Sequence, residues 1–292
     1  MSKFLRSGLA AALPVAAMLA AAPAIAQTEG AAANADLAAK LGGDNVTVGV
    51  AGAYIPDYEG SNDYRFTPAP AVIGQFKGFS FSVIGNRATV DLIPNRPGQS
   101  IDIQAGPIAV LNFDRGTLKN IDDRRVRALG KIDNAIELGG YIGIGKTGII
   151  TSPYDKLSIS VSYRHDVSDV HDSGIWQPSI NYLTPLSRKA AVGLVASAQH
   201  VERGYGQTYF SISPQQSLAS GLPVYNARAG WKNYQVGGFF TYSLTGDLLH
   251  GVKLIAGGTY SRMLGAYSYS PIVRTAGNPN QWLGAAGLAY TF

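Results

Sequence analysis

Residues 282–292, the last eleven of the chain, read WLGAAGLAYTF. Large apolar side chains fall at alternate positions here, and the residues between them are small except for Leu283. Successive side chains of a β-strand point to opposite faces, so this stretch predicts a strand whose apolar face reaches the final residue. A soluble chain usually ends in polar, loosely held residues, so this face needs an apolar environment. The face consists of Trp282, Ala286, Leu288, Tyr290 and Phe292.

The same two-residue period runs through most of the chain. In KLSISVSYRHD, residues 156–166, Ile159 and Tyr163 share an apolar face, whereas the serines and Arg164 share the opposite face. Such alternation predicts half-buried strands and an all-β fold. The expected strands are 45–55, 66–76, 78–92, 100–111, 134–145, 155–166, 174–184, 189–201, 207–213, 233–244, 250–263 and 281–292.

Twelve is an even number of strands, as a closed single-chain barrel with both ends on one side requires. Ten strands are the alternative, because 174–184 and 207–213 alternate least clearly. Closure matters in lipid, where every backbone N–H and C=O must find a partner within the protein.

Two architectures produce strands with one apolar face: a soluble sandwich or barrel, and an outer-membrane barrel whose apolar face meets lipid. The polar faces carry mostly Ser, Thr, Gly and Ala, whereas a water-facing soluble sheet usually carries more Lys and Glu. Tyrosines lie near strand ends, as an interfacial girdle requires. We therefore expect a transmembrane antiparallel up-and-down barrel with its termini in the periplasm. The expected inward residues are Glu137, Arg164, Asp166, Gln199 and Lys253.

The first 26 residues predict a secretory signal peptide. Lys3 and Arg6 precede a short apolar run, and the small residues before Gln27 indicate cleavage after Ala26. We expect a flexible tail at 27–44, the barrel at 45–292, and localisation in the outer membrane of a Gram-negative bacterium. The expected surroundings are the lipid bilayer and lipopolysaccharide.

The composition excludes several function classes. The chain has no cysteine, so it has neither disulfides nor thiolate chemistry. Its formal net charge of +5 falls to +3 once Lys3 and Arg6 are removed, too little to indicate nucleic-acid binding. No run of 18 or more apolar residues follows the signal peptide, which argues against membrane-spanning helices.

One connection departs from the expected pattern of short periplasmic turns. The connection formed by residues 112–133 is long and rich in Lys and Arg. The expected strand order places this connection in the periplasm. Arg124, Arg125 and Arg127 are therefore candidate contacts for an acidic partner surface or murein carboxylates. The alternative is an ordinary solvated loop.

Several motifs occur in the order seen in one family of outer-membrane proteins. The run Pro56, Asp57, Tyr58, Glu59, Gly60 and Ser61 resembles the first-loop motif of the MipA/OmpV family, the MltA-interacting outer-membrane proteins. KIDNAIELGGYIGI, YGQTYFSISPQQSLASGLPVY, SYSPIV and GLAYTF resemble later family segments, so the resemblance covers about 45–292.

The resemblance implies a scaffold that ties a lytic transglycosylase to a murein synthase. The alternative is a narrow channel or a surface receptor for small solutes or antibiotics. The inward polar groups could line a solute path, or they could pair and fill the lumen. The terminal row of Trp282, Leu288, Tyr290 and Phe292 resembles the C-terminal assembly signal of bacterial outer-membrane proteins.

No constellation predicts catalysis or a cofactor. His171 and Asp172 lie with Ser173 in a polar turn, but adjacency in sequence does not supply the geometry that a nucleophile and its base need. Asp57, Glu59 and Asp63 offer alternate oxygen ligands for calcium, yet they lack a full calcium-loop pattern. We expect a protein that is not an enzyme and has no cofactor.

Overall fold

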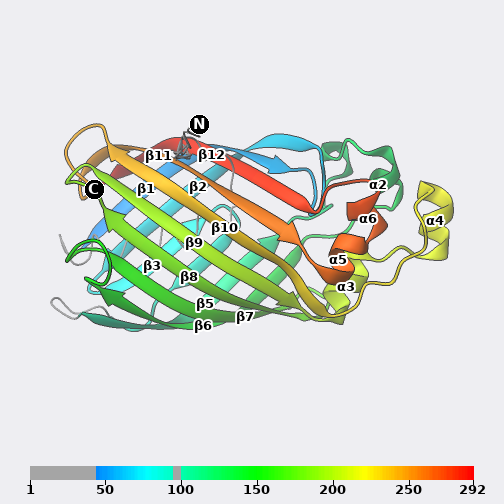
Figure 1. The fold of residues 1–292 in the computed structure, drawn as a ribbon, viewed down its shortest axis with the longest axis horizontal. Helices are drawn as coiled ribbons and strands as arrows, with labels where there is room; N and C mark the ends of the chain where they lie inside the picture. The colour runs from blue at the N-terminus through cyan, green and yellow to red at the C-terminus, as the bar shows by residue number, and fades with distance from the viewer. Residues whose placement is uncertain (1–43, 95–99) are drawn as a thin grey trace, which may run out of the picture.

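The computed structural model describes residues 44–94 and 100–292. The predicted signal peptide, its cleavage after Ala26, and the predicted tail up to residue 43 lie outside this part of the chain. Twelve antiparallel strands form a closed barrel in which each strand pairs with its neighbours in the sequence, and β1 pairs with β12 (Figure 1). The predicted all-β barrel of twelve strands is thus confirmed. The strands are β1 Asn45–Pro56, β2 Tyr64–Phe76, β3 Phe79–Ile84, β4 Arg87–Val90, β5 Ile101–Asn112, β6 Ala135–Thr147, β7 Lys156–Asp166, β8 Gly174–Pro185, β9 Ala190–Val201, β10 Gly230–Ser243, β11 Gly251–Met263 and β12 Asn280–Thr291.

The predicted number of strands is correct although two of the predicted strands are wrong, because one error adds a strand and the other removes one. The predicted strand 78–92 is a hairpin of β3 and β4, turned by Gly85 at φ 56° and by Asn86. A short connection of Gly and Asn is a hairpin signal, and the alternation on either side concealed it. The predicted strand 207–213 is wrong, because most of it belongs to helix α3 (Arg203–Phe210).

The last strand closes the barrel, as its apolar period predicted. Thr47 pairs with Thr291, and Tyr54 pairs with Gly284 at the far end of the ladder. The backbone N–H of Phe292 donates to the carbonyl of Val46 over 2.9 Å. The ladder between β1 and β12 therefore leaves no open strand edge along this seam, as lipid requires.

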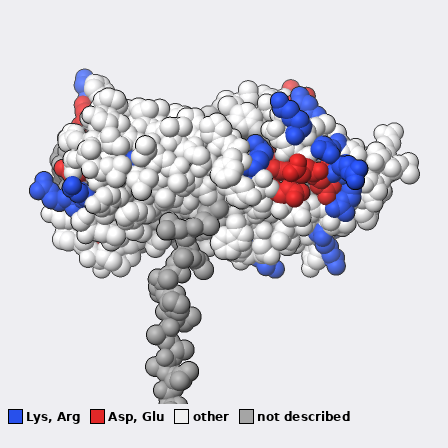
Figure 2. Space-filling view, turned by 90° about the horizontal axis from the view of Figure 1, so that it is seen from above, with Lys and Arg blue, Asp and Glu red and all other residues white. Residues whose placement is uncertain are grey.

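The barrel is apolar outside and polar inside, the reverse of a soluble barrel. Ile159, Leu254 and Leu288 are exposed on the outer surface, whereas Ser162 and Thr259 on the alternate positions are buried. The predicted inward orientation is confirmed for Glu137, Arg164, Asp166, Gln199 and Lys253, all of which are buried. On the face that Figure 2 shows, the middle of the barrel is almost free of charged groups, and the charges gather toward the two ends.

Aromatic pairs mark both edges of this apolar band. Near one end, Tyr163 packs on Trp176 with ring centroids 4.7 Å apart, and Tyr260 packs on Trp282 at 4.8 Å. Near the other end, Tyr290 packs on Phe292 at 4.8 Å. Amphipathic rings favour the membrane–water boundary, so the pairs indicate where lipid would begin and end. Within the described residues, no helix has the length and apolarity to span a membrane.

Candidate functional site

The long connections gather at the end of the barrel opposite the described termini. There they form a cap, made of residues 57–63, 113–134, 167–173, 202–229 and 264–279 (Figure 1). The connections at the other end, which we call the terminal end, are short turns apart from 91–100. The cap contains the 3₁₀ helix η1 (Leu118–Asn120) and the helices α2 (Arg124–Ala128), α3, α4 (Pro214–Ser220), α5 (Gly265–Tyr269) and α6 (Pro271–Arg274).

The predicted family motif at 56–61 holds the cap together. The buried ring of Tyr58 packs among side chains of three other cap connections, and its hydroxyl donates to the carbonyl of Ala276 over 2.6 Å. Gly60 adopts φ 95°, and a Cβ at this position would lie 2.5 Å from Val273 Cγ2. Glycine is therefore required here both by the backbone conformation and by the close approach of α6. Ser61 is fully buried, and its backbone bridges to Gly277.

Glu59 is the charged centre of the motif. Lys232 Nζ, from the start of β10, lies 2.6 Å from Glu59 Oε1, and the hydroxyl of Tyr205 donates to Glu59 Oε2 over 2.8 Å. The same Nζ donates to the Tyr205 hydroxyl over 3.0 Å and lies 4.6 Å from the centroid of that ring. The Lys232 side chain is 2% exposed, so its charge depends on these contacts. One ion pair thereby ties the first cap connection, α3 and the barrel wall.

A second carboxyl, that of Asp114, lies beside this ion pair. It accepts the backbone N–H of Glu59 over 2.7 Å. Burial, followed by the nearby negative charge of Glu59, raises the pKa of Asp114 to about 6. The neighbouring Arg115 is buried, donates to the carbonyl of Thr208 over 2.9 Å, and has its pKa lowered by burial. Burial therefore disfavours the charged forms of both Asp114 and Arg115 in this part of the cap.

Beneath the cap, a polar network crosses the upper lumen. Arg164 Nε lies 2.5 Å from Glu137 Oε2, and its guanidinium also donates to Gln177 Oε1 over 3.0 Å. His171 Nε2 lies 3.4 Å from Glu137, and its Nδ1 lies 2.9 Å from the hydroxyl of Ser173. Of the two open alternatives for the inward polar groups, these contacts favour groups that pair and fill the lumen.

The contacts run from Ser173 to His171 to Glu137, as in the triad of a hydrolase, but the resemblance ends there. The side chain of His171 is fully buried, and Ser173 is 3% exposed. The Ser173 hydroxyl also accepts the backbone N–H of Tyr205 over 2.8 Å, which holds α3 against the turn after β7. This geometry connects two cap segments and leaves no approach for a substrate to the hydroxyl.

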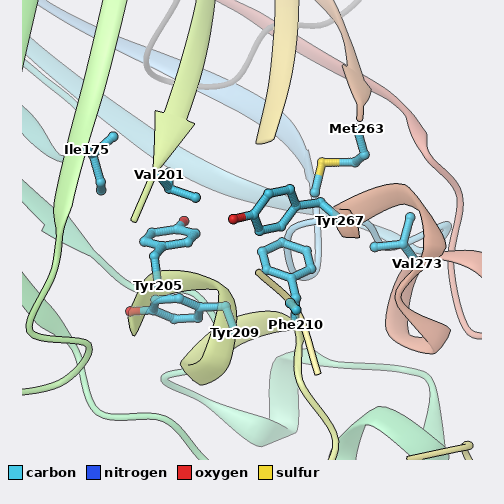
Figure 3. Packing of buried hydrophobic residues seen from close by; sticks show 9 residues of the cluster. Ile175, Val201, Tyr205, Tyr209, Phe210, Met263, Tyr267 and Val273 are labelled. Atoms are coloured by element: carbon cyan, nitrogen blue, oxygen red, sulfur yellow. The ribbon is translucent and has the colours of Figure 1, made fainter. Parts of the chain in front are cut away.

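Aromatic packing completes the closure. Tyr205, Tyr209 and Phe210 from α3 pack against Tyr267 of α5, over the ends of β8 and β9 (Figure 3). The rings of Tyr205 and Tyr209 lie 4.7 Å apart, and Phe210 meets Tyr267 edge-on at 5.2 Å. Figure 2 shows, on the viewed face of the cap, an acidic patch ringed by Lys and Arg.

The predicted placement of Arg124, Arg125 and Arg127 at the same end of the barrel as the termini is wrong. The hairpin β3–β4 adds a strand before residues 112–133, which puts this connection in the cap, at the end opposite the termini. Arg125 pairs with Asp123 at 2.7 Å and donates to the carbonyl of Thr275, while Arg127 donates to the carbonyl of Ile121. Arg124 is exposed.

The three candidate calcium ligands, Asp57, Glu59 and Asp63, form hydrogen bonds or ion pairs with different residues. Asp57 accepts the backbone N–H of Asp122 over 3.1 Å, whereas Glu59 binds Lys232. The backbone N–H of Asp63 donates to Ser61. Among the described residues, no group of three or more acidic or histidine side chains is arranged to hold a metal ion.

Sequence reasoning missed Lys232, Tyr205 and Asp114 as partners of Glu59. Tyr205 stands in a quoted family segment, which was the available signal for it. Lys232 gave no such signal, because an irregularity between Trp231 and Asn233 breaks the alternation at the start of β10. Both Lys232 and Asn233 consequently face inward and are buried.

Comparison with known proteins agrees with the quoted motifs. A family model described as "MltA-interacting protein MipA" matches residues 48–292. No curated protein matches the chain. Among solved structures, the chain is similar to the NanC porin at 9% identity and a TM-score of 0.46, covering 83% of this chain and 98% of that one. An outer membrane channel from Pseudomonas putida F1 gives 10% identity and a TM-score of 0.41, covering 85% and 95%. These scores are too low to carry an argument about function. The match of the family model over most of the chain shows that the protein belongs to the MltA-interacting protein MipA family.

Proposed function

We propose that this protein acts in the outer membrane of a Gram-negative bacterium as a scaffold that binds other envelope components, and that it neither conducts solutes nor catalyses a reaction. The supporting observation is the closed cap, in which the Glu59–Lys232 ion pair and the aromatic packing around Tyr205 cover the barrel end. A pore needs a continuous aqueous path, and the Arg164–Glu137 network beneath the cap occupies part of that path.

The lytic transglycosylase and the murein synthase are the proposed partners. The name of the family supports the first, and the motifs at 56–61 and 205–225 resemble those of that family. Both partners work on murein, so contact requires a surface in the periplasm. With the termini in the periplasm, the terminal end offers that surface, and Arg124 in the cap lies on the opposite side of the membrane.

Site-specific photo-crosslinking in envelopes tests this assignment. A crosslinker replaces Arg188, exposed in the turn between β8 and β9 at the terminal end, or Arg124, exposed in the cap. We expect lytic transglycosylase adducts from position 188 and none from position 124. Adducts from 124 alone would reverse the proposed orientation, and their absence from both positions would refute the scaffold role.

Planar-bilayer recording tests the closed lumen separately. We expect no steady conductance from the wild-type protein and intermittent opening in a variant with Glu59→Gln and Tyr205→Phe, which loses the charged contacts of the cap. Steady conductance of the wild type would favour the narrow channel instead.

A further inference from the structure

A cavity of about 110 Å³ lies in the half of the lumen nearer the terminal end. Its walls are mostly small apolar residues that face inward from β1, β2 and β12, including Ala51, Ala71 and Ala289. The turn between β10 and β11 brings Leu248 to the cavity as well. Larger side chains at these positions would fill the space, so the small residues create the cavity.

The size of the cavity limits what it can hold. An engineered apolar cavity of about 150 Å³ in another protein admits benzene. A cavity of about 110 Å³ therefore suits one ring or a short branched chain, provided that the small-residue walls yield slightly. Its apolar walls favour an apolar body over a sugar or a peptide.

One charged group, Lys253 of β11, lines this cavity. The Lys253 side chain is 7% exposed, and its Nζ donates to the hydroxyl of Thr291 over 2.6 Å and to the carbonyl of Leu248. Both acceptors are neutral. The nearby Asp247 directs its carboxylate to the backbone N–H groups of Leu249 and His250 instead.

Three other buried cations of the barrel each form an ion pair with a carboxylate. Lys156 lies 2.6 Å from Asp102, Arg164 lies 2.5 Å from Glu137, and Lys232 is paired with Glu59. Within the described part of the chain, no carboxylate lies within ion-pair distance of Lys253. A buried ammonium with only neutral acceptors retains much of its desolvation penalty, which a bound anion would offset.

We propose that the terminal half of the lumen binds a small apolar carboxylate, with the carboxylate on Lys253 and the apolar body between the small side chains of β1, β2 and β12. The ammonium supplies a charge-assisted hydrogen bond, and the walls exclude water from around it. Recognition requires both parts, so neither a neutral ring nor a small inorganic anion satisfies the site.

Isothermal titration of the full mature chain in detergent, with benzoate as the probe, tests this proposal. We expect saturable one-to-one binding, and at least tenfold weaker binding of benzamide, which has the same shape without the charge. Lys253→Gln keeps a hydrogen-bonding side chain and should weaken benzoate binding at least tenfold. Lys146→Gln removes an equal charge from the exposed outer face of β6 and should leave binding unchanged.

A second variant separates the cavity from the charge. Ala51→Leu should abolish benzoate binding by filling the cavity while leaving Lys253 in place. Circular dichroism and heat-modifiable gel mobility establish that each variant is folded. No binding by the wild type, equal binding of benzamide, or unchanged binding in folded Lys253→Gln or Ala51→Leu would each overturn the proposal.

Discussion

Replacing Glu59 by Gln should loosen the cap without unfolding the barrel. The change leaves the 2%-exposed ammonium of Lys232 with the Tyr205 hydroxyl and a neutral amide. Removing one partner of a fully buried ion pair costs about 3–5 kcal/mol. The Glu59 side chain is 30% exposed, so solvent reaches the pair and we expect a smaller loss of about 2–3 kcal/mol.

The reverse change should cost less. Lys232→Met removes the charge but keeps a flexible apolar side chain against the Tyr205 ring. Glu59 then stays partly solvated and retains the hydrogen bond from Tyr205, so we expect a loss of about 1 kcal/mol. The double variant should cost less than the sum of the two, because the buried charge is no longer left unpaired.

Hydrogen exchange followed by mass spectrometry measures these losses locally. Amide exchange in 57–63 and in α3 should rise about 30- to 150-fold in Glu59→Gln, since about 1.4 kcal/mol corresponds to a factor of ten. Exchange in the strands should stay unchanged. Lys131→Met is the control, because Lys131 pairs with Asp133 on the surface of the cap. Equal and additive effects of the two single variants would refute the asymmetry derived from burial.

Three further outcomes follow from the geometry of the barrel and cap. Leu254→Arg, on the exposed outer face, should destabilise the barrel in lipid vesicles by about 2–4 kcal/mol near the bilayer midplane, and Ala71→Ser, which adds only a small hydroxyl facing the cavity, should cost less; the reverse order in urea titrations would contradict the face assignment. Phe292→Ser should lower the amount of folded barrel in the outer membrane, and unchanged heat-modifiable mobility and abundance would count against an assembly signal. Burial raises the pKa of Asp114 to about 6, so the folded cap binds this proton more tightly than the unfolded chain does, and cap stability should fall as pH rises from about 4 through 6. Asp114→Asn should remove that slope in hydrogen-exchange measurements corrected for intrinsic rates, and an unchanged slope would show that another group causes it.

Alternation predicted the barrel wall well because the polarity of each wall residue depends only on whether its side chain faces the lipid or the lumen. A side chain such as Ile159 or Leu254 must be apolar wherever its strand lies in the barrel, so its own sequence position carries the information. The turn at Gly85 and Asn86 was missed although the exposed apolar positions change across it from odd numbers, such as Phe79 and Val83, to even numbers, such as Val90. That one turn shifted the predicted side of every connection from 93–99 onward, until the false strand at 207–213 restored the order.

The cap could not be predicted in the same way. Its central ion pair joins Glu59 and Lys232, which lie 173 residues apart, and no local period relates them. The orientation of Lys232 also depends on the irregularity between Trp231 and Asn233. The family motif at 56–61 did identify one side of the site, yet the motif names residues without naming what they contact.

A barrel surrounded by lipid can present recognition groups only at its two ends and in its lumen, because its outer wall must stay apolar. The long connections that form the cap enclose one end around Glu59 and Tyr205, so access to the lumen from that side requires several buried contacts to break together. Lys253 and its cavity lie beyond the Arg164–Glu137 network, toward the end with the short turns. Ligand entry from the terminal end therefore needs no opening of the cap. The two proposed activities, partner binding and carboxylate binding, consequently share one end of the molecule, and a bulky partner bound at the turns should slow the exchange of benzoate. Stopped-flow dilution of bound benzoate, with and without the lytic transglycosylase, measures this directly: equal release rates would place either the partner surface or the ligand entrance at the capped end instead.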